Sequence, residues 1–254
     1  MRNRQAGVSL IELILAITIS TFLAIGAARV YVSFTKNTAQ QKRNMQFQQE
    51  MTTAAKIMED DLRMMGYGLP GNGLEVSMTG QRIDSVHVFK NEKDYETTLT
   101  ADASSGSTTL SVLSIAGAEV DGWVCINVGS DALYRRITAK TGTTGSWQIS
   151  LATALPAGTY TVAATKIFYT PRVTYFVDRS TTPNRLVRRE NTRPFYISST
   201  VDSLKVLAAN AGDSLLTSNF GTARTMTIVM SGGGGANRAG VRVDSVSAVI
   251  RNYM

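Results

Sequence analysis

Residues 7–28 read GVSLIELILAITISTFLAIGAA, and this stretch decides how the rest of the chain is organised. It carries a single charged residue, Glu12, and the run from Leu13 to Ala28 has none. From Val8 to Val32 there are 25 residues, which as an α-helix cover about 37 Å against a hydrocarbon core of about 30 Å. The stretch therefore predicts a helix that spans a bilayer.

The residues on either side of this span indicate its orientation. Arg2 and Arg4 precede it with no acidic residue between, so the positive-inside rule predicts a cytoplasmic N-terminus. A removable secretory signal would end at a small-residue cleavage site, whereas Arg29 and then a polar helical pattern follow here. A carboxylate inside a membrane helix costs about 2.5–3.5 kcal/mol on insertion scales. Glu12 therefore either pairs with a cation or reaches the headgroups.

Gly7, followed by Val8-Ser9-Leu10-Ile11-Glu12-Leu13 and the charge-free run, resembles the class III signal of type IV prepilins and type II secretion pseudopilins. The resemblance implies that a prepilin peptidase cleaves after Gly7 and methylates the new N-terminal amine of Val8. It also implies an assembly ion pair, in which the amine on Val8 of one subunit neutralises Glu12 of a neighbour where water is scarce. Val8 and Ser9 stand where the family usually has phenylalanine and threonine.

Beyond the span, residues 34–65 contain neither proline nor glycine, which favours one continuous helix. Apolar residues recur there at helical spacing, so we expect one buried stripe with its methionines as core packing. The stripe consists of Phe47, Met51, Ala54, Met58, Leu62 and Met65. Gly66 and Gly68 provide the stop. We expect a stalk helix over residues 8–66, transmembrane at 8–32, with Glu59, Asp60 and Asp61 on a solvated face.

The end of the stalk and the last third of the chain carry a narrower resemblance, to the PilW-like minor pilins of type IV pili. It rests on an acidic residue before Leu62-Arg63 with Gly66-Tyr67 after it, and on four later segments. These segments are Val173-x-Tyr175, Leu186-x-Arg188, Val201 to Leu207, and Val241-Arg242-Val243. A generic amphipathic helix that ends on a glycine cap would explain the stalk pattern as well.

From Leu69 onward the chain alternates in the manner of β-strands separated by turns. We expect an α+β, pilin-like fold, with the long N-terminal helix packed on a C-terminal antiparallel β head at 67–254, after a leader at 1–7. Within the head, residues 97–168 predict an inserted β module built as a small barrel or sandwich. Its turn signals include Asp121-Gly122, Thr141-Gly142, Thr144-Gly145 and Pro156-Ala157-Gly158. A hairpin of Val173–Val177 and Arg185–Arg189 follows.

The composition excludes several classes of protein and offers little chemistry. A 43% hydrophobic content argues against disorder, and one cysteine, Cys125, against a disulfide scaffold. His87 is the only histidine, so a site built from several histidines is excluded. We expect His87 to be a surface or packed strand residue and Cys125 a buried one. We predict no catalytic residue, metal site or cofactor, and no enzymatic activity.

The net charge of +7 is concentrated in one hairpin. Between Pro171 and Arg193 six arginines stand against Asp178 and Glu190. The six are Arg172, Arg179, Arg185, Arg188, Arg189 and Arg193. One hypothesis is an anion-binding face for DNA, surface polysaccharide or an acidic neighbouring pilin. The other is a solvated hairpin whose arginines protect a sheet edge from aggregation.

The resemblance implies a minor pilin that prepilin peptidase processes and that joins a priming or tip complex of a type IV pilus, supporting adhesion, motility or DNA uptake. Its partners would be major and minor pilins, the prepilin peptidase and the inner-membrane assembly platform. The precursor would cross the inner membrane once, with a cytoplasmic leader and a periplasmic head, and reach the pilus or cell surface after assembly. The alternatives are a type II secretion minor pseudopilin and, in another class, a membrane-anchored adhesin or DNA-binding receptor.

Overall fold

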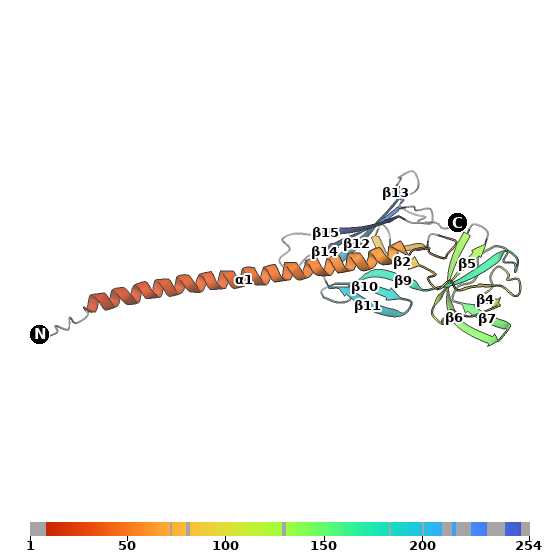
Figure 1. Cartoon of the computed structure of the whole chain (residues 1–254), viewed down its shortest axis with the longest axis horizontal. Helices are drawn as coiled ribbons and strands as arrows, with labels where there is room; N and C mark the ends of the chain where they lie inside the picture. Colours follow the sequence, from red (N-terminus) through yellow and green to blue (C-terminus); the bar gives the residue numbers. More distant parts are fainter. Residues whose placement is uncertain are drawn as a thin grey trace. The chain divides into compact units, whose positions relative to one another are not determined.

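The fold is described from a computed structural model (Figure 1). It covers residues 9–71, 73–79, 82–128, 131–182, 184–199, 201–209, 215–216, 225–232 and 242–249. The chain divides into two compact units, the first ending at Gln48 and the second beginning at Gln49. One long helix is followed by antiparallel β-sheets, so the predicted α+β class is confirmed.

Helix α1 runs from Leu10 to Arg63 and has 54 residues (Figure 1). By length and composition it is able to cross a membrane. Its large apolar side chains from Leu10 to Phe34 are exposed on the chain itself. The hydroxyls of Thr18 and Thr21 donate hydrogen bonds to carbonyls one turn earlier, at 2.9 and 2.7 Å. Such back-bonding satisfies the hydroxyl groups within the helix, as an apolar surrounding requires.

The second part of α1 belongs to the β-rich unit and buries the predicted stripe. Met51, Ala54 and Met58 are completely buried, and Leu62 is 1% exposed. The helix ends where Gly66 and Gly68 follow with φ of 73° and 64°, a left-handed conformation that glycine adopts without steric cost.

The chain then enters the first sheet through a close contact with the end of the helix. The Gly66 N–H donates to the Phe89 carbonyl at 2.9 Å, and the Phe89 N–H donates to the Gly73 carbonyl at 2.8 Å. Gly73 has φ of 67°, and a Cβ there would lie 2.5 Å from both the Gly66 nitrogen and the Phe89 oxygen. Only glycine fits at this position.

Five strands form the sheet that receives the helix, all antiparallel, in the order β1-β2-β9-β10-β11. Their bounds are β1 Leu74–Thr79, β2 Arg82–Phe89, β9 Arg172–Asp178, β10 Arg185–Glu190 and β11 Arg193–Ser198. The predicted hairpin is confirmed as β9 and β10, in which Tyr175 pairs with Arg188. Val86, Val88, Val173 and Leu186 are completely buried. β1 and β11 were not predicted.

A second sheet has the order β13-β12-β14-β15. The strands are β12 Val201–Ala209, β13 Leu215–Leu216, β14 Thr225–Gly232 and β15 Arg242–Val249. Burial alternates along β14, where Met226, Ile228 and Met230 are completely buried, as expected of a strand with one face in a core. The glycine run at 233–235 lies outside the described residues.

The third sheet has six strands in the order β3-β8-β5-β6-β7-β4. The strands are β3 Glu96–Thr98, β4 Thr109–Val112, β5 Trp123–Val128, β6 Asp131–Thr143, β7 Ser146–Leu151 and β8 Thr165–Thr170. Leu99 forms a bridge with Val112, and the Leu113 N–H donates to the Thr98 carbonyl at 3.0 Å. The two edge strands therefore meet, and the sheet closes around its own apolar core.

The turn predicted at Thr141-Gly142 is wrong, because β6 continues to Thr143 and the hairpin reverses at Thr144-Gly145. Gly142 pairs with Trp147 and has φ of 119°. A Cβ at Gly142 would lie 2.2 Å from the Ser146 carbonyl oxygen. This glycine allows close approach within the ladder instead of marking its end.

An aromatic cluster joins the six-stranded and five-stranded sheets. The rings of Phe89 and Tyr134 stack at 4.0 Å between centroids, and Trp123 meets Phe89 edge-on at 5.6 Å. The Arg172 guanidinium lies 4.0 Å from the centre of the Trp123 ring. Cys125 is buried in the same cluster, as predicted. Residues of β2 and β9 thus contact residues of β5 and β6 directly.

Candidate functional site

Glu12 lies in the first turn of α1, where its N–H donates to the Ser9 carbonyl at 3.0 Å. Its helical neighbours Ile11 and Leu13 are apolar and are 77% and 54% exposed. The next charged residue along the helix is Arg29, roughly 25 Å further at the α-helical rise per residue. A cation that neutralises Glu12 therefore has to come from outside the described part of α1. Gly7 and Val8, the predicted cleavage and methylation residues, lie outside the described residues.

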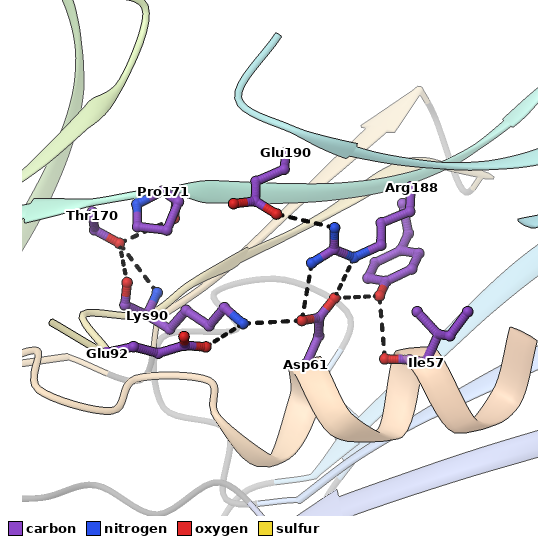
Figure 2. A network of polar contacts seen from close by, with 9 residues as sticks. Ile57, Asp61, Lys90, Glu92, Thr170, Pro171, Arg188 and Glu190 are labelled. Carbon is purple, nitrogen blue, oxygen red and sulfur yellow. Dashed lines mark hydrogen bonds and ion pairs between the residues drawn. The ribbon is translucent and has the colours of Figure 1, made fainter. Parts of the chain in front are cut away.

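A second polar site lies at the other end of the helix, around Asp61 (Figure 2). Asp61 is only 6% exposed. Arg188 of β10 holds it with two bonds, from Nε to Oδ2 at 2.7 Å and from Nη2 to Oδ1 at 3.2 Å. The Tyr175 hydroxyl of β9 donates to Oδ2 at 2.5 Å. Lys90 Nζ lies 3.2 Å from Oδ1. Each carboxylate oxygen therefore accepts two hydrogen bonds.

Two further carboxylates complete this network on its outer side. Glu190 accepts from Arg188 Nη1 at 3.1 Å, and Glu92 lies 2.5 Å from Lys90 Nζ. Both glutamates are nearly half exposed, whereas the side chains of Lys90 and Arg188 are only 12% and 16% exposed. The two buried cations thus face one buried and two surface carboxylates, which leaves the network with one excess negative charge.

The pKa of Asp61 follows from the balance of burial and pairing. Burial raises it, but the hydrogen bonds from Arg188 and Tyr175 and the positive charges of Arg188 and Lys90 outweigh burial, so the pKa lies below its ordinary value of 3.8. Burial lowers the pKa of Lys90, and Glu92 and Asp61 more than compensate, so its pKa is raised. Asp61 is ionised and both cations are charged at neutral pH.

The prediction that Asp61 lies on a solvated face is wrong. Glu59 is partly buried and pairs with Arg63 along the helix surface, and Asp60 is exposed. Asp61 stands three residues after Met58 and four before Met65, which places it on the buried stripe. An acidic residue at stripe spacing was the signal for a buried ion-pair site.

Glu50 fastens the same helix at a second point. Its Oε2 accepts hydrogen bonds from the Ser198 hydroxyl at 3.1 Å, the Ser199 N–H at 3.1 Å and the Ser199 hydroxyl at 3.3 Å. Ser198 ends β11 and is 4% exposed. Two carboxylates of α1, eleven residues apart, therefore bind the two outermost strands on one side of the five-stranded sheet.

The comparisons bear on the N-terminal end of the chain. Residues 2–28 match the prokaryotic N-terminal methylation motif. With the apolar helix, this motif supports a membrane-anchored, type IV pilin-like or pseudopilin-like prepilin, which implies processing by prepilin peptidase and assembly with other pilins.

No curated protein matches the chain. A solved structure, the Phage phi92 endosialidase, is similar with 13% identity and a TM-score of 0.22 over 69% of this chain. The chain spans 34% of that protein. A likeness at this level carries no argument about fold or function.

The six arginines of this prepilin-like chain are not gathered on one face. Arg188 turns toward α1. Arg185 lies three residues before it on β10 and Arg189 one residue after it, so both point to the opposite side of the sheet. Arg189 lies 4.9 Å from the centre of the Phe176 ring, and Arg185 lies 5.3 Å from that of Tyr196.

The other three arginines differ in position. Arg172 stands three residues before Tyr175 on β9, so strand alternation places it on the same side of the sheet as Arg185 and Arg189, and it stacks on Trp123. Arg179 Nη2 donates to the Asp202 carbonyl at 3.3 Å, and Arg193 is exposed on β11. Among the described residues that the sequence singled out, Arg188, Asp61 and Tyr175 therefore meet at the helix, and Arg172 and Arg189 lie near His87.

His87 and Cys125 are packed residues. Both ring nitrogens of His87 face hydroxyls, Ser85 at 3.1 Å and Thr174 at 3.0 Å. Burial and repulsion from Arg172 and Arg189 lower the pKa of His87 to about 4, so it is neutral at pH 7. Burial raises the pKa of the Cys125 thiol to about 12. Within the described ranges no group of His, Cys, Asp and Glu is arranged to hold a metal ion.

Proposed function

We propose that this chain is a PilW-like minor pilin of a type IV pilus. In this proposal residues 1–7 are a leader that prepilin peptidase removes, Val8 becomes the methylated N-terminus, and the span at 8–32 stores the precursor in the inner membrane. The head faces the periplasm until the assembly platform feeds the subunit into a priming or tip complex. Its partners are the major pilin and other minor pilins.

One observation carries the proposal. The methylation motif at residues 2–28 is continuous with a helix that does not end at the membrane but runs to Arg63 and is buried in a β-rich unit. A simple anchor needs about 20 apolar residues and then a linker. A helix of 54 residues, its last turns built into the core of the folded part, suits a subunit whose anchor becomes part of a filament.

The Asp61 network supports the PilW-like assignment. The resemblance to that family rests in part on the acidic residue before Leu62, on Tyr175 and on Arg188. Asp61 lies on the helix, more than 100 residues from Tyr175 and Arg188 on the two strands. Its Oδ2 lies 2.5 Å from the Tyr175 hydroxyl and 2.7 Å from Arg188 Nε. The contacts supply a physical reason for those residue types. They fix the helix to the sheet, so that force on the stalk is transmitted to the head.

Glu12 gives the proposal its assembly step. A carboxylate among exposed apolar side chains is costly in lipid, and the next charge on α1, Arg29, lies too far away to neutralise it. The amine that cleavage creates on Val8 of a neighbouring subunit would supply the missing cation. The ion pair would compensate for the free energy of placing the Glu12 carboxylate in lipid. It forms at only one axial position of the two helices, and this sets the register of the filament.

The test is incorporation of full-length variants into filaments. Glu12→Leu leaves the neighbour's amine unpaired, and a penalty of about 2.5–3.5 kcal/mol predicts a loss of at least about tenfold in the sheared filament fraction. Membrane levels of the precursor should stay unchanged. Glu59→Gln, which changes a partly exposed glutamate on the same helix, is the matched control. Normal incorporation of Glu12→Leu would refute the assembly step.

A further inference from the structure

A pocket of about 250 Å³ lies where the five-stranded and six-stranded sheets meet. Its walls are the segment 90–95 after β2, the turn at 117–122, the end of β8, and the turn between β10 and β11. At ~30 Å³ per water molecule it has room for about eight. It is smaller than the ~300–1,000 Å³ typical of sites for drug-sized ligands. The space suits a single small ring with its substituents.

The walls of the pocket are held by internal hydrogen bonds. The Tyr95 N–H donates to Asn91 Oδ1 at 3.0 Å, and Asn91 is 1% exposed. On the opposite wall the Asn191 N–H donates to the Arg172 carbonyl at 2.8 Å, and Asn191 Oδ1 accepts the Arg172 N–H at 2.9 Å. Gly117 has φ of 84°, and a Cβ there would lie 2.1 Å from the Tyr95 ring. The pocket is therefore formed before a ligand arrives.

Aromatic and hydrogen-bonding groups share the lining. Tyr95, which is 36% exposed, provides ring surface. Trp123 and Tyr169 also line the pocket, but Arg172 stacks on the Trp123 ring and Tyr169 is only 2% exposed. Glu119 adds an exposed carboxylate. Glu92 and Glu190 each have one oxygen bound to Lys90 or Arg188, which fixes the carboxylate and leaves the second oxygen as an acceptor. Asn191, whose side-chain oxygen is used by β9, retains an amide NH₂ group that can donate. Such a mixture of flat apolar surface and fixed polar groups is the usual make-up of a small-molecule site.

The charges of the lining argue against an ionic ligand. Lys90 is committed to Asp61 and Glu92, so it is not available to an anion. Around the pocket three cations, Lys90, Lys93 and Arg188, stand against four carboxylates, Asp61, Glu92, Glu119 and Glu190, so the net attraction on a cation is small. Lys93 lies 6.0 Å from the centre of the Tyr95 ring, where its charge would repel a ligand cation. A neutral ligand with an apolar face and peripheral hydroxyl groups is compatible with these charges.

We propose that this pocket binds the ring of one neutral sugar, a hexose or an N-acetylhexosamine. Tyr95 would cover the C–H face of the ring, while Glu92, Glu119, Glu190 and Asn191 would bind its hydroxyls. The chemistry is the same for a free monosaccharide and for the terminal unit of a glycan. This inference goes beyond filament assembly and does not depend on it.

The experiment uses the full chain in lauryldimethylamine oxide micelles, because glycoside detergents would compete for the pocket. Glucose, galactose and N-acetylglucosamine are tested separately by saturation-transfer NMR, with their methyl β-glycosides as models of a terminal glycan unit. Glucuronic acid and choline are the charged probes. We expect saturation of at least one neutral sugar, with affinity in the millimolar range expected of a ligand with about a dozen heavy atoms. The charged probes should give no signal.

Variants locate the binding. Tyr95→Ala removes an aromatic wall and Glu119→Ala a carboxylate at the rim, and each should weaken binding, the first by tenfold or more. Glu96→Ala is the matched control, since Glu96 is an exposed carboxylate that pairs with Lys166 away from the pocket. Because Glu119 is exposed, its variant keeps the test valid should Tyr95→Ala unfold. The proposal is overturned by no signal from any neutral sugar, by equal signals from the charged probes, or by unchanged binding in both pocket variants.

If only the methyl glycosides bind, the source is a terminal glycan unit; if the free sugars bind equally well, a free monosaccharide is the source. Either result supports the proposed chemistry.

Discussion

Replacement of Asp61 by asparagine is the most informative perturbation of the stalk-to-head contact. The change keeps the size of the side chain and removes its charge. Arg188 and Lys90 are then left with a neutral partner, although their side chains are only 16% and 12% exposed. The variant thus tests whether the carboxylate holds the helix on the sheet or merely fills space.

The magnitude follows from the geometry. Removing one partner of a buried ion pair costs about 3–5 kcal/mol, because the other charge stays buried without compensation. Tyr175→Phe removes only the hydroxyl that donates at 2.5 Å, which for a bond to a charged group corresponds to about 1.5–3 kcal/mol. Asp61→Leu combined with Arg188→Met and Lys90→Met removes all three buried charges, and such replacements are commonly neutral or stabilising. The triple variant should therefore recover most of the stability that Asp61→Asn loses.

The assay is thermal and urea unfolding of the full chain in nonionic micelles, followed by β-sheet circular dichroism. A loss of about 3 kcal/mol corresponds to about 6–12 °C in Tm for a folded unit of this size. Hydrogen exchange of the amides of residues 57–62 reports the same contact locally. Glu59→Gln breaks an exposed pair on the same helix, and should cost no more than about 0.5 kcal/mol.

The pH dependence gives a second, independent signature. The folded pKa of Asp61 is lowered, so its contribution is present above the ordinary value of 3.8 and is lost as pH falls through the folded pKa. The stability gap between the wild type and Asp61→Asn should be constant from neutral pH to about pH 4 and close below it. A stability difference between wild type and Asp61→Asn that is no larger than the one for Glu59→Gln would refute this role of Asp61. So would a difference that does not change below about pH 4.

Three further outcomes follow from the structure. Gly73→Ala should destabilise by more than Gly145→Ala, and by more than about 1 kcal/mol, since both have positive φ but only Gly73 has backbone atoms 2.5 Å from the new Cβ; urea unfolding compares them. Cys125, with its pKa raised to about 12, should stay inert toward a thiol reagent at pH 8 and react on unfolding, and a rapid reaction in the folded state would contradict its burial. Glu50→Ala should cost about 1.5–3 kcal/mol and expose the amides around Ser198 to hydrogen exchange.

The helix and many strands were predictable because their patterns are local. The stripe from Met51 to Met65 has helical spacing, and the turn residues Thr182-Pro183-Asn184 stand between the segments that form β9 and β10. Strand β11 was not predicted, because a proline such as Pro194 argues against a strand. β11 is an edge strand, however, where a residue without an N–H can leave the hydrogen-bonding of the sheet intact. Gly142 was taken as a turn because sequence alone does not distinguish a reversal from a close approach of two strands.

The polar site was only half predictable. Stripe spacing marks Asp61 as buried, and a buried carboxylate requires cations. Its partners Lys90 and Arg188 are 29 and 127 residues away, so only the folded topology identifies them. The arginine cluster shows the reverse. Strand alternation turns Arg188 toward α1, whereas Arg172, Arg185 and Arg189 lie on the other side of the sheet, each against an aromatic ring.

The central claim is that the chain is a processed filament subunit, and the mass of its mature N-terminus tests this most directly. The full chain is expressed with and without a prepilin peptidase, and its intact mass and N-terminal sequence are measured. With the peptidase, the chain should lose residues 1–7 and begin at Val8 with one added methyl group. Retention of Met1 in the presence of an active peptidase would contradict processing and favour a simple membrane anchor.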